Sequence, residues 1–338
     1  MGYVTNFPGG IFATPSIGSG TGDIFTGLGS SVFFVDGDKG NDGNEGKSPD
    51  NAKLTIQSAV TAAALSNVEY GGGSTVYIKA KAITDYTGDP TSYAETVIIP
   101  FTGGERMRLI GASNGRTQGG LPQIKIGAGS TAMLTIRAPG CLIQNIGFNG
   151  GSSTGGGILL DDDYTTKSAF GTTIDSCHFK NCKGSTATNA ATGGAIMWTA
   201  LGNAWQVSIT NNRFYKNVGD VVLKGNSTSE PQDVLIENNI FGGPAASVDC
   251  NLYLPGGMNG VIIRNNEFTA TPAIGSGTNA LYMDLTGCIG MLVGNSFATS
   301  TALTFGASGT GAKVPVTVFM PKNYRETTTG VSSEIFRT

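Results

Sequence analysis

The phrases SITNNRF (208–214), LIENNIF (235–241) and IIRNNEF (262–268) are variants of one short motif. Three looser copies flank them: LIQNIGF (142–148), TIDSCHF (173–179) and, one residue shorter, LVGNSF (292–297). The Phe residues that close the six copies are 31, 35, 27, 27 and 29 positions apart. A period that varies within this range is typical of a solenoid, whose coils are short strands joined by loops of variable length.

Aligned on that Phe, the six copies form columns of equivalent side chains. An aliphatic column and a Phe column would fill the core, because stacked strands bring equivalent positions to about 4.8 Å from one another. Between them lies a column that is Asn in four copies, and a buried Asn is costly unless its amide is hydrogen-bonded. We therefore predict a ladder of amides between successive coils, formed by Asn212, Asn239, Asn266 and Asn295.

A second strand accompanies each motif: GILLD (157–161), AIMW (195–198), VVLK (221–224), LYLP (252–255), LYMD (281–284) and ALTF (302–305). Alternation predicts an inward column made of Ile158, Ala195, Val221, Leu252, Leu281 and Ala302. The outward strip would then be mostly apolar and would carry Trp198, Tyr253, Tyr282 and Phe305. We expect this strip to be the seam between parallel copies, a groove in which the aromatic rings stack on sugars, or a face covered by the chain's own loops.

The ends of the chain differ from the repeats. Residues 48–67 place apolar side chains near helical spacing, which predicts an amphipathic helix that caps the coil. We expect a first strand, an Asp/Gly-rich loop and this helix over 31–72, the parallel coil over 73–306, and a strand and tail over 307–338. Residues 1–30 carry spaced apolar side chains among Gly, Ser and Thr, which indicates an extended arm that attaches to another protein.

The stretch VFFVDGDKGNDGNEGKSPDNAKLTIQSAV (32–60) resembles the beginning of right-handed parallel β-helix proteins of the pectate lyase and phage tailspike type. In those families a strand, an Asp/Gly/Asn-rich loop, a Ser-Pro and a Thr-Ile-Gln-x-Ala helix follow in this order. With the repeats, the resemblance covers roughly residues 31–306. It implies an all-β fold, a right-handed parallel β-helix (solenoid) with an N-terminal capping helix. It leaves function open, because this fold hosts lyases, hydrolases and inert virion proteins.

Composition excludes several classes of protein. The 338 residues include 52 Gly, only 13% are charged, and the formal net charge is −3, which argues against a nucleic-acid-binding protein. No run of 18 apolar residues is present to span a membrane. The N-terminus lacks the basic and apolar segments of a signal peptide, so we expect no export by that route. The five Cys residues do not have zinc-site spacing and are expected to be buried thiols.

Candidates for catalysis are sparse. Asp175 and Glu237 lie on the outward face of the motif strands, two coils or about 10 Å apart, at the outer limit for an inverting glycoside hydrolase. Arg264 follows one coil later, where it would pair with Glu237, and a solvated row of charges is the simpler interpretation. Asp161 and Asp284 share the face of the second strands, but four coils, roughly 19 Å, separate them.

The loop before the predicted helix is the best candidate for a metal site. Asp36, Asp38, Asn41 and Asp42 supply hard oxygen ligands on a Gly-rich turn, which suits Ca²⁺. The loop lacks the EF-hand spacing, and a turn stabilised by these side chains is the alternative. The sequence indicates no other cofactor.

These features favour a virion structural protein of a bacteriophage. We expect a homotrimeric β-helix, displayed as a capsid decoration (cement) protein or short spike and attached to capsid or tail proteins through the arm. The missing export signal fits assembly in the host cytoplasm. The alternative is a tailspike or lyase-like enzyme that binds and cleaves host surface polysaccharide, and an adhesin-like surface protein is a third. A host surface glycan is an open partner, whereas no nucleic-acid or membrane partner is expected.

Overall fold

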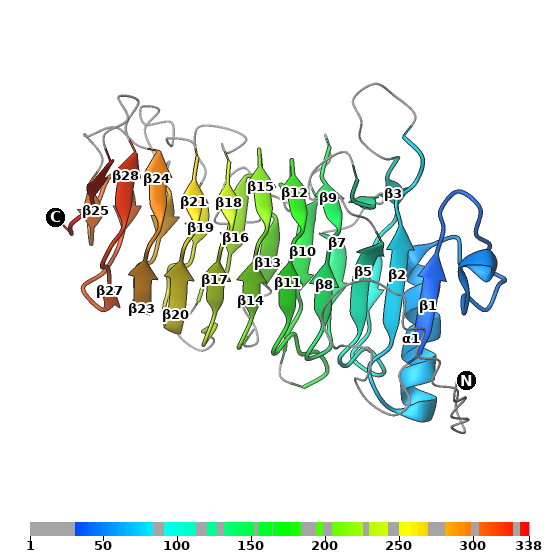
Figure 1. Cartoon of the computed structure of the whole chain (residues 1–338). Helices are drawn as coiled ribbons and strands as arrows, with labels where there is room; N and C mark the ends of the chain where they lie inside the picture. The colour runs from blue at the N-terminus through cyan, green and yellow to red at the C-terminus, as the bar shows by residue number, and fades with distance from the viewer. Residues whose placement is uncertain are drawn as a thin grey trace, which may run out of the picture.

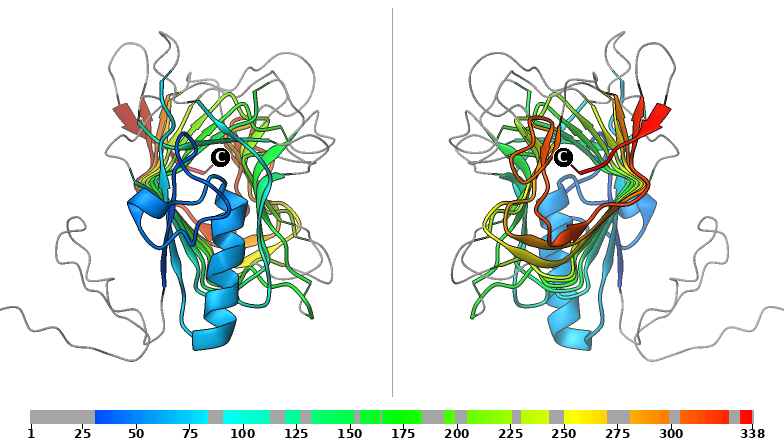
Figure 2. Two further views of the ribbon diagram at one scale, coloured as in Figure 1. Left: turned by 90° about the vertical axis from the view of Figure 1, so that its right-hand side faces the viewer. Right: turned by 90° about the vertical axis from the view of Figure 1, so that its left-hand side faces the viewer.

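The chain winds into coils that stack along one axis (Figure 1). The structure, a computed structural model, describes residues 31–83, 91–112, 120–126, 132–151, 155–163, 165–183, 194–198, 205–225, 230–242, 250–269, 281–298, 304–326 and 332–337. Each coil contributes a strand to each of three sheets, which surround a common interior when seen along the axis (Figure 2). The arm expected over 1–30 lies outside the described residues.

The three sheets are numbered here in the order in which the chain visits them within one coil. Sheet I consists, in spatial order, of β1 (Val32–Val35), β2 (Thr75–Lys79), β5 (Arg108–Ala112), β8 (Leu142–Gln144), β11 (Thr173–Asp175), β14 (Ser208–Thr210), β17 (Leu235–Glu237), β20 (Met258–Arg264), β23 (Cys288–Val293) and β27 (Val318–Phe319). Sheet II consists of β3 (Tyr93–Ala94), β6 (Gln123–Lys125), β9 (Gly147–Asn149), β12 (His178–Lys180), β15 (Arg213–Tyr215), β18 (Ile240–Phe241), β21 (Glu267–Phe268), β24 (Ser296–Ala298), β28 (Tyr324–Glu326) and β29 (Ser332–Glu334). Sheet III consists of β4 (Val97–Ile99), β7 (Ala132–Ile136), β10 (Gly156–Leu160), β13 (Ile196–Trp198), β16 (Gly219–Val222), β19 (Cys250–Tyr253), β22 (Met283–Asp284), β26 (Ala312–Lys313) and β25 (Phe305–Gly306).

Strand pairing within the sheets is parallel, apart from the antiparallel pair of β28 and β29 at the C-terminal end. The predicted right-handed parallel β-helix with an N-terminal helix is confirmed. The coil also continues past residue 306, because β26, β27 and β28 form one further set of strands in the three sheets. The sequence analysis assigned these residues to a terminal strand and tail.

In the six coils from β8 to β24, the corner between sheets I and II is a turn of two residues. Its first residue is left-handed, with φ of 56° at Asn145, 58° at Asn211, 57° at Asn238 and 55° at Asn265. Asn adopts this conformation more readily than most residues that carry a Cβ. The second residue of the turn points into the interior, so in the three copies with Asn-Asn the two Asn residues have different roles.

The inward residues of these turns form a hydrogen-bonded ladder. In Asn239, Nδ2 donates to Ile209 O at 2.9 Å and to Asn266 Oδ1 at 3.0 Å, while Oδ1 accepts from the backbone N–H of Asn212 at 2.9 Å. The same pattern continues through Asn295 to Asn323, one coil beyond the last copy of the motif. Every rung is buried, so each amide replaces lost water with bonds to the next coil.

The Phe column is one continuous stack in the interior. Successive ring centroids lie 4.6–5.0 Å apart in nearly parallel planes, through Phe148, Phe179, Phe214, Phe241, Phe268 and Phe297. Ile124 occupies the equivalent position before the stack and Arg325 the one after it. Arg325 therefore ends the motif, which is why the sequence alone did not reveal the last rung at Asn323.

The N-terminal end of the coil is covered by α1 (Ile56–Tyr70), preceded by the short 3-10 helix η2 (Pro49–Asn51) (Figure 2). Thr55 Oγ1 caps α1 by accepting from the N–H of Ser58, and the Glu95 carboxylate accepts from the N–H groups of Ile56 and Gln57. These bonds satisfy N–H groups that the first turn of a helix leaves open. No helix in the described part of the chain is long and apolar enough to cross a membrane.

All five cysteines are buried and none forms a disulfide. Burial raises the pKa of the Cys141 and Cys177 thiols to about 12, because the thiolate would lose its hydration. Both thiols approach backbone carbonyl oxygens, as small core residues do.

Candidate functional site

The outward face of sheet I carries the candidate catalytic residues in a single row. Strand register aligns five outward residues from β8 to β20: Gln144, Asp175, Thr210, Glu237 and Arg264. Asp175 and Glu237 are thus two strands apart, as predicted, and Arg264 lies next to Glu237. The row is polar and continuous, and whether it does chemistry depends on what each carboxylate binds.

The Asp175 carboxylate accepts four hydrogen bonds from neighbouring side chains. The donors lie 2.7–3.0 Å away and are Asn211 Nδ2, Thr210 Oγ1, Gln144 Nε2 and Ser176 Oγ. Burial raises the pKa of this group, but the four hydrogen bonds outweigh burial and hold the pKa below its usual range. A general acid needs the opposite shift, so Asp175 is suited to bracing three coils.

Glu237 is held by Arg264 through two parallel hydrogen bonds. Nε donates to Oε1 at 2.7 Å and Nη2 to Oε2 at 3.0 Å, which is the paired geometry of a guanidinium and a carboxylate. Both carboxylate oxygens therefore face a cation. The arrangement matches the salt bridge that the sequence analysis weighed against a catalytic role.

Three of the four aromatic residues predicted on the outward strip lie inside the protein. Trp198, Tyr282 and Phe305 are 8%, 0% and 1% exposed. The Trp198 indole donates to Lys224 O at 2.8 Å, and Tyr282 and Phe305 pack around Phe297 at the end of the Phe stack. Their assignment to a sugar-binding groove or a subunit seam was wrong.

At Trp198 the error is a register shift of one residue, because Ile158 pairs with Ile196 rather than with Ala195. Side chains alternate along a strand, so a shift of one residue exchanges the inner and outer faces. At Tyr282 the cause is different: Leu252 pairs with Met283, two residues after Leu281, so β22 begins after Tyr282 and alternation does not extend back to it. Leu303 and Ala302 of the last predicted strand lie outside the described residues.

The true outward row of sheet III is Leu159, Met197, Val222, Tyr253, Asp284 and Lys313. Tyr253 is the one predicted aromatic residue that belongs to this row, and it is half-buried. Met197 and Val222 are buried within the chain itself, so this row offers little apolar surface to a partner. Of the three interpretations given to the strip, burial by the chain itself fits best.

Ion pairs neutralise Asp161, directly after β10, and Asp284, which belongs to this row. Asp161 receives Arg137 Nε at 2.8 Å and Lys167 Nζ at 3.3 Å. Asp284 receives Lys313 Nζ at 3.1 Å and Thr286 Oγ1 at 2.6 Å. The two carboxylates lie four strands apart, as expected, and cannot act on one bond.

The candidate calcium ligands are engaged in hydrogen bonds with their own loop, with residues 54–55 before α1, and with residues 79 and 82 on and after β2. Asp36 binds Lys79 Nζ at 2.6 Å, and Asp38, Asn41 and Asp42 accept from backbone N–H groups. The backbone N–H groups that donate to these four side chains belong to Asp38, Lys39, Ala82, Gly43, Leu54 and Thr55. This is the stabilised turn offered as the alternative. Within the described residues, no three His, Cys, Asp or Glu side chains gather as they would around a metal ion.

A second apolar row, on sheet I, was missed in the sequence. Strand register aligns Leu235, Ile262, Met291 and Phe319 on the outward face of β17, β20, β23 and β27. Ile262 and Met291 are each 39% exposed, and Phe319 is 64% exposed. The sequence carries a signal for this row. The residue directly before each inward aliphatic residue is itself apolar in LI (235–236), II (262–263) and ML (291–292).

Comparison with known proteins adds likenesses of fold. No family model and no curated protein sequence matches this chain. A rhamnogalacturonan lyase structure is 12% identical, with a TM-score of 0.39 over 91% of this chain and 90% of that chain. The native GH136 lacto-N-biosidase from Eubacterium ramulus is 10% identical, with a TM-score of 0.36 over 87% of this chain and 68% of that chain.

Proposed function

We propose that this protein is a structural component of a bacteriophage particle. In this proposal it is a homotrimer of parallel β-helices, displayed on the particle surface as a decoration protein or short spike. The observation that carries the proposal is the exposed apolar row on sheet I. Among the described residues, the outward row of sheet III, where the seam was expected, offers little apolar surface.

The row on sheet I suits contact with copies of the same chain. Leu235, Ile262, Met291 and Phe319 repeat once per coil, so a parallel copy presents an equivalent row at the same spacing of about 4.8 Å. Exposed apolar surface of this kind usually marks a contact between proteins, and copies of one chain usually close into symmetric rings. In a trimer of parallel coils, the three rows would face the common axis and be buried there.

The state of the carboxylates supports a structural role. Asp175 is saturated by hydrogen bonds, and Glu237, Asp161 and Asp284 are each paired with a cation. Such pairs brace neighbouring coils, whereas glycoside hydrolysis needs one carboxylate that carries a proton and one that does not. The arm over 1–30 is assigned to attachment to a capsid or tail protein.

Light scattering of the full chain tests the trimer. We expect a mass of three times 34.6 kDa. The double variant Ile262→Asp/Met291→Asp should release monomers, because two charges per copy would be buried in the seam. The matched control is Leu65→Asp/Val68→Asp, which changes two exposed apolar residues of α1 and should remain trimeric. A monomeric wild type would refute the seam.

Particle membership is tested separately. An antibody against the chain should label purified particles of the phage that encodes it. Deletion of residues 1–30 should abolish that labelling and leave the trimer intact. Particles that carry none of the protein would refute the virion role.

A further inference from the structure

The outward face of sheet II carries a cluster of positive charges that the proposed structural role does not use. The basic face is defined here by side chains on or just after β6, β12 and β15, namely Lys125, Lys180, Lys183, Arg213 and Lys216. Lys125, Arg213 and Lys216 are exposed, and Lys180 and Lys183 are partly exposed. In a chain with a formal net charge of −3, five cations on one face are a marked concentration.

Strand register places two of these charges, Lys125 and Lys180, in a row of hydrogen-bonding side chains. Lys125 aligns with Asn149, Asn149 with Lys180, and Lys180 with Tyr215, so this row advances one strand at a time from β6 to β15. Three steps of roughly 4.8 Å give a row about 14 Å long. His178 and Arg213 form a second, parallel pair on β12 and β15. The face therefore offers a linear track of donors rather than a pocket.

Carboxylates are absent from the outward positions of these strands. From β6 to β15, sheet II has no Asp or Glu, and the next acidic residue along the sheet is Glu267 on β21. Asp175 lies across the turn, where four hydrogen bonds occupy its carboxylate. None of the ion pairs between described residues involves Lys125, Lys183 or Lys216. The charges of these three lysines are thus available to an anion from outside.

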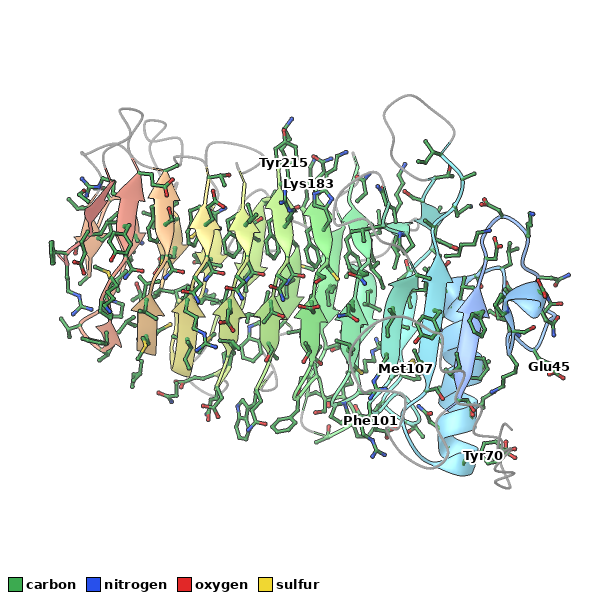
Figure 3. The ribbon with its side chains drawn as sticks, in the orientation of Figure 1. Glu45, Tyr70, Phe101, Met107, Lys183 and Tyr215 are labelled. Atoms are coloured by element: carbon green, nitrogen blue, oxygen red, sulfur yellow. The ribbon has the colours of Figure 1, made fainter. Side chains whose placement is uncertain are left out.

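An aromatic ring lies among the cations. Tyr215 is 44% exposed, and Lys216 Nζ lies 5.1 Å from the centre of its ring. Figure 3 shows Tyr215 and Lys183 at the same edge of the molecule, near the ends of β15 and β12. Tyrosine combines an apolar ring with a polar hydroxyl, so it can pack against the apolar face of a sugar while neighbouring lysines bind its acidic groups.

We infer that the basic face binds an anionic polysaccharide. A linear polymer with repeated acidic groups matches cations spread along several coils of one face, and lysines bind such groups as point charges. Single-stranded nucleic acids are bound instead by a series of aromatic side chains on which successive bases stack, and this face has one. The inference goes beyond the proposed structural role and does not depend on the chain's forming trimers or joining a particle.

Dextran sulfate and uncharged dextran are the probes, because they share a backbone and differ in charge. We expect the full chain to bind dextran sulfate at low salt, to ignore dextran, and to bind oligo(dT) more weakly than dextran sulfate. The triple variant Lys125→Gln/Lys183→Gln/Lys216→Gln should weaken binding of dextran sulfate about tenfold or more and make it less sensitive to salt.

The control is a triple variant with the same loss of charge elsewhere. Lys39→Gln/Lys224→Gln/Lys322→Gln changes three exposed lysines outside the basic face and should alter binding by less than about twofold. Equal weakening in both triple variants would overturn the site, as would binding of uncharged dextran or no binding at low salt. Tighter binding of oligo(dT) than of dextran sulfate would replace the inference with a nucleic-acid site. Each variant is compared at matched thermal stability, and the trimer is assayed separately.

Discussion

Arg264 and Glu237, on adjacent strands of sheet I, are joined by two hydrogen bonds of 2.7 and 3.0 Å between guanidinium and carboxylate. A general acid has to carry a proton on one carboxylate oxygen, and here both oxygens accept from the same cation. The pair instead connects two coils at the surface, where water and salt weaken its contribution to stability.

We therefore expect Glu237→Gln to match the wild type both in thermal stability and in any cleavage of a polysaccharide. The measurement is release of reducing ends and of unsaturated uronates from a polysaccharide panel, with melting followed by circular dichroism. Glu267→Gln, which removes an exposed carboxylate from sheet II, is the matched control. Cleavage by the wild type that disappears in Glu237→Gln and in Asp175→Asn, with melting unchanged, would establish an enzyme.

The Asn ladder should be far more sensitive than that ion pair. Asn239→Leu removes both the donors to Ile209 O and Asn266 Oδ1 and the acceptor for the Asn212 N–H, all buried. Leaving these groups without partners should cost about 3–5 kcal/mol, measured from the urea unfolding midpoint.

The adjacent residue provides the control. Asn238 is exposed, and its φ of 57° is one that Gly adopts without strain, so Asn238→Gly should be nearly neutral. If Asn239→Leu proved as mild as Asn238→Gly, the ladder would not stabilise the coil.

Sheets I and II were predictable because a rigid turn links them. In the six coils that carry the motif this turn has two residues, so one Phe fixes the register of both strands, and the Ile, Asn and Phe columns follow. The ladder position of Asn323 was not predicted, because Arg325 replaces the Phe that marks the motif. The basic face was not predicted for another reason: Lys125 and Lys216 are far apart in sequence and come to the same face only when coils stack.

Sheet III was less predictable because loops of variable length precede its strands. In AIMW (195–198) both Ala195 and Ile196 are apolar, so alternation alone allows either register. The packing decides it, since Ile196 and Trp198 fill interior space beside Ile158 and Leu160 that Ala195 and Met197 would leave partly empty.

The corrected register makes a direct prediction. Trp198→Ala should cost about 3–5 kcal/mol in urea unfolding, because it leaves a large cavity and frees the Lys224 carbonyl oxygen from its indole donor. Tyr253→Ala, on the outward row of the same sheet, should cost about 1 kcal/mol. The opposite order of the two costs would restore the register that places Trp198 on the surface.

The hydrogen bonds to Asp175 predict a dependence of stability on pH. Burial raises the pKa of this carboxyl, but hydrogen bonds from Asn211, Gln144, Thr210 and Ser176 outweigh it, so the folded pKa lies below the unfolded value of about 3.9. The charged group therefore stabilises the fold above about pH 4, and this contribution disappears as the pH falls through the folded pKa.

Asp175→Asn tests this dependence through urea midpoints between pH 7 and pH 3. At pH 7 the variant should be about 1–2 kcal/mol less stable, because its amide group cannot accept from the four donors. The difference should shrink below about pH 4, where the wild type protonates Asp175 and loses the same bonds. Asp50→Asn, at an exposed site, is the control and should follow the wild type throughout. A constant gap between wild type and Asp175→Asn at every pH would mean that the four hydrogen bonds do not lower the pKa of Asp175.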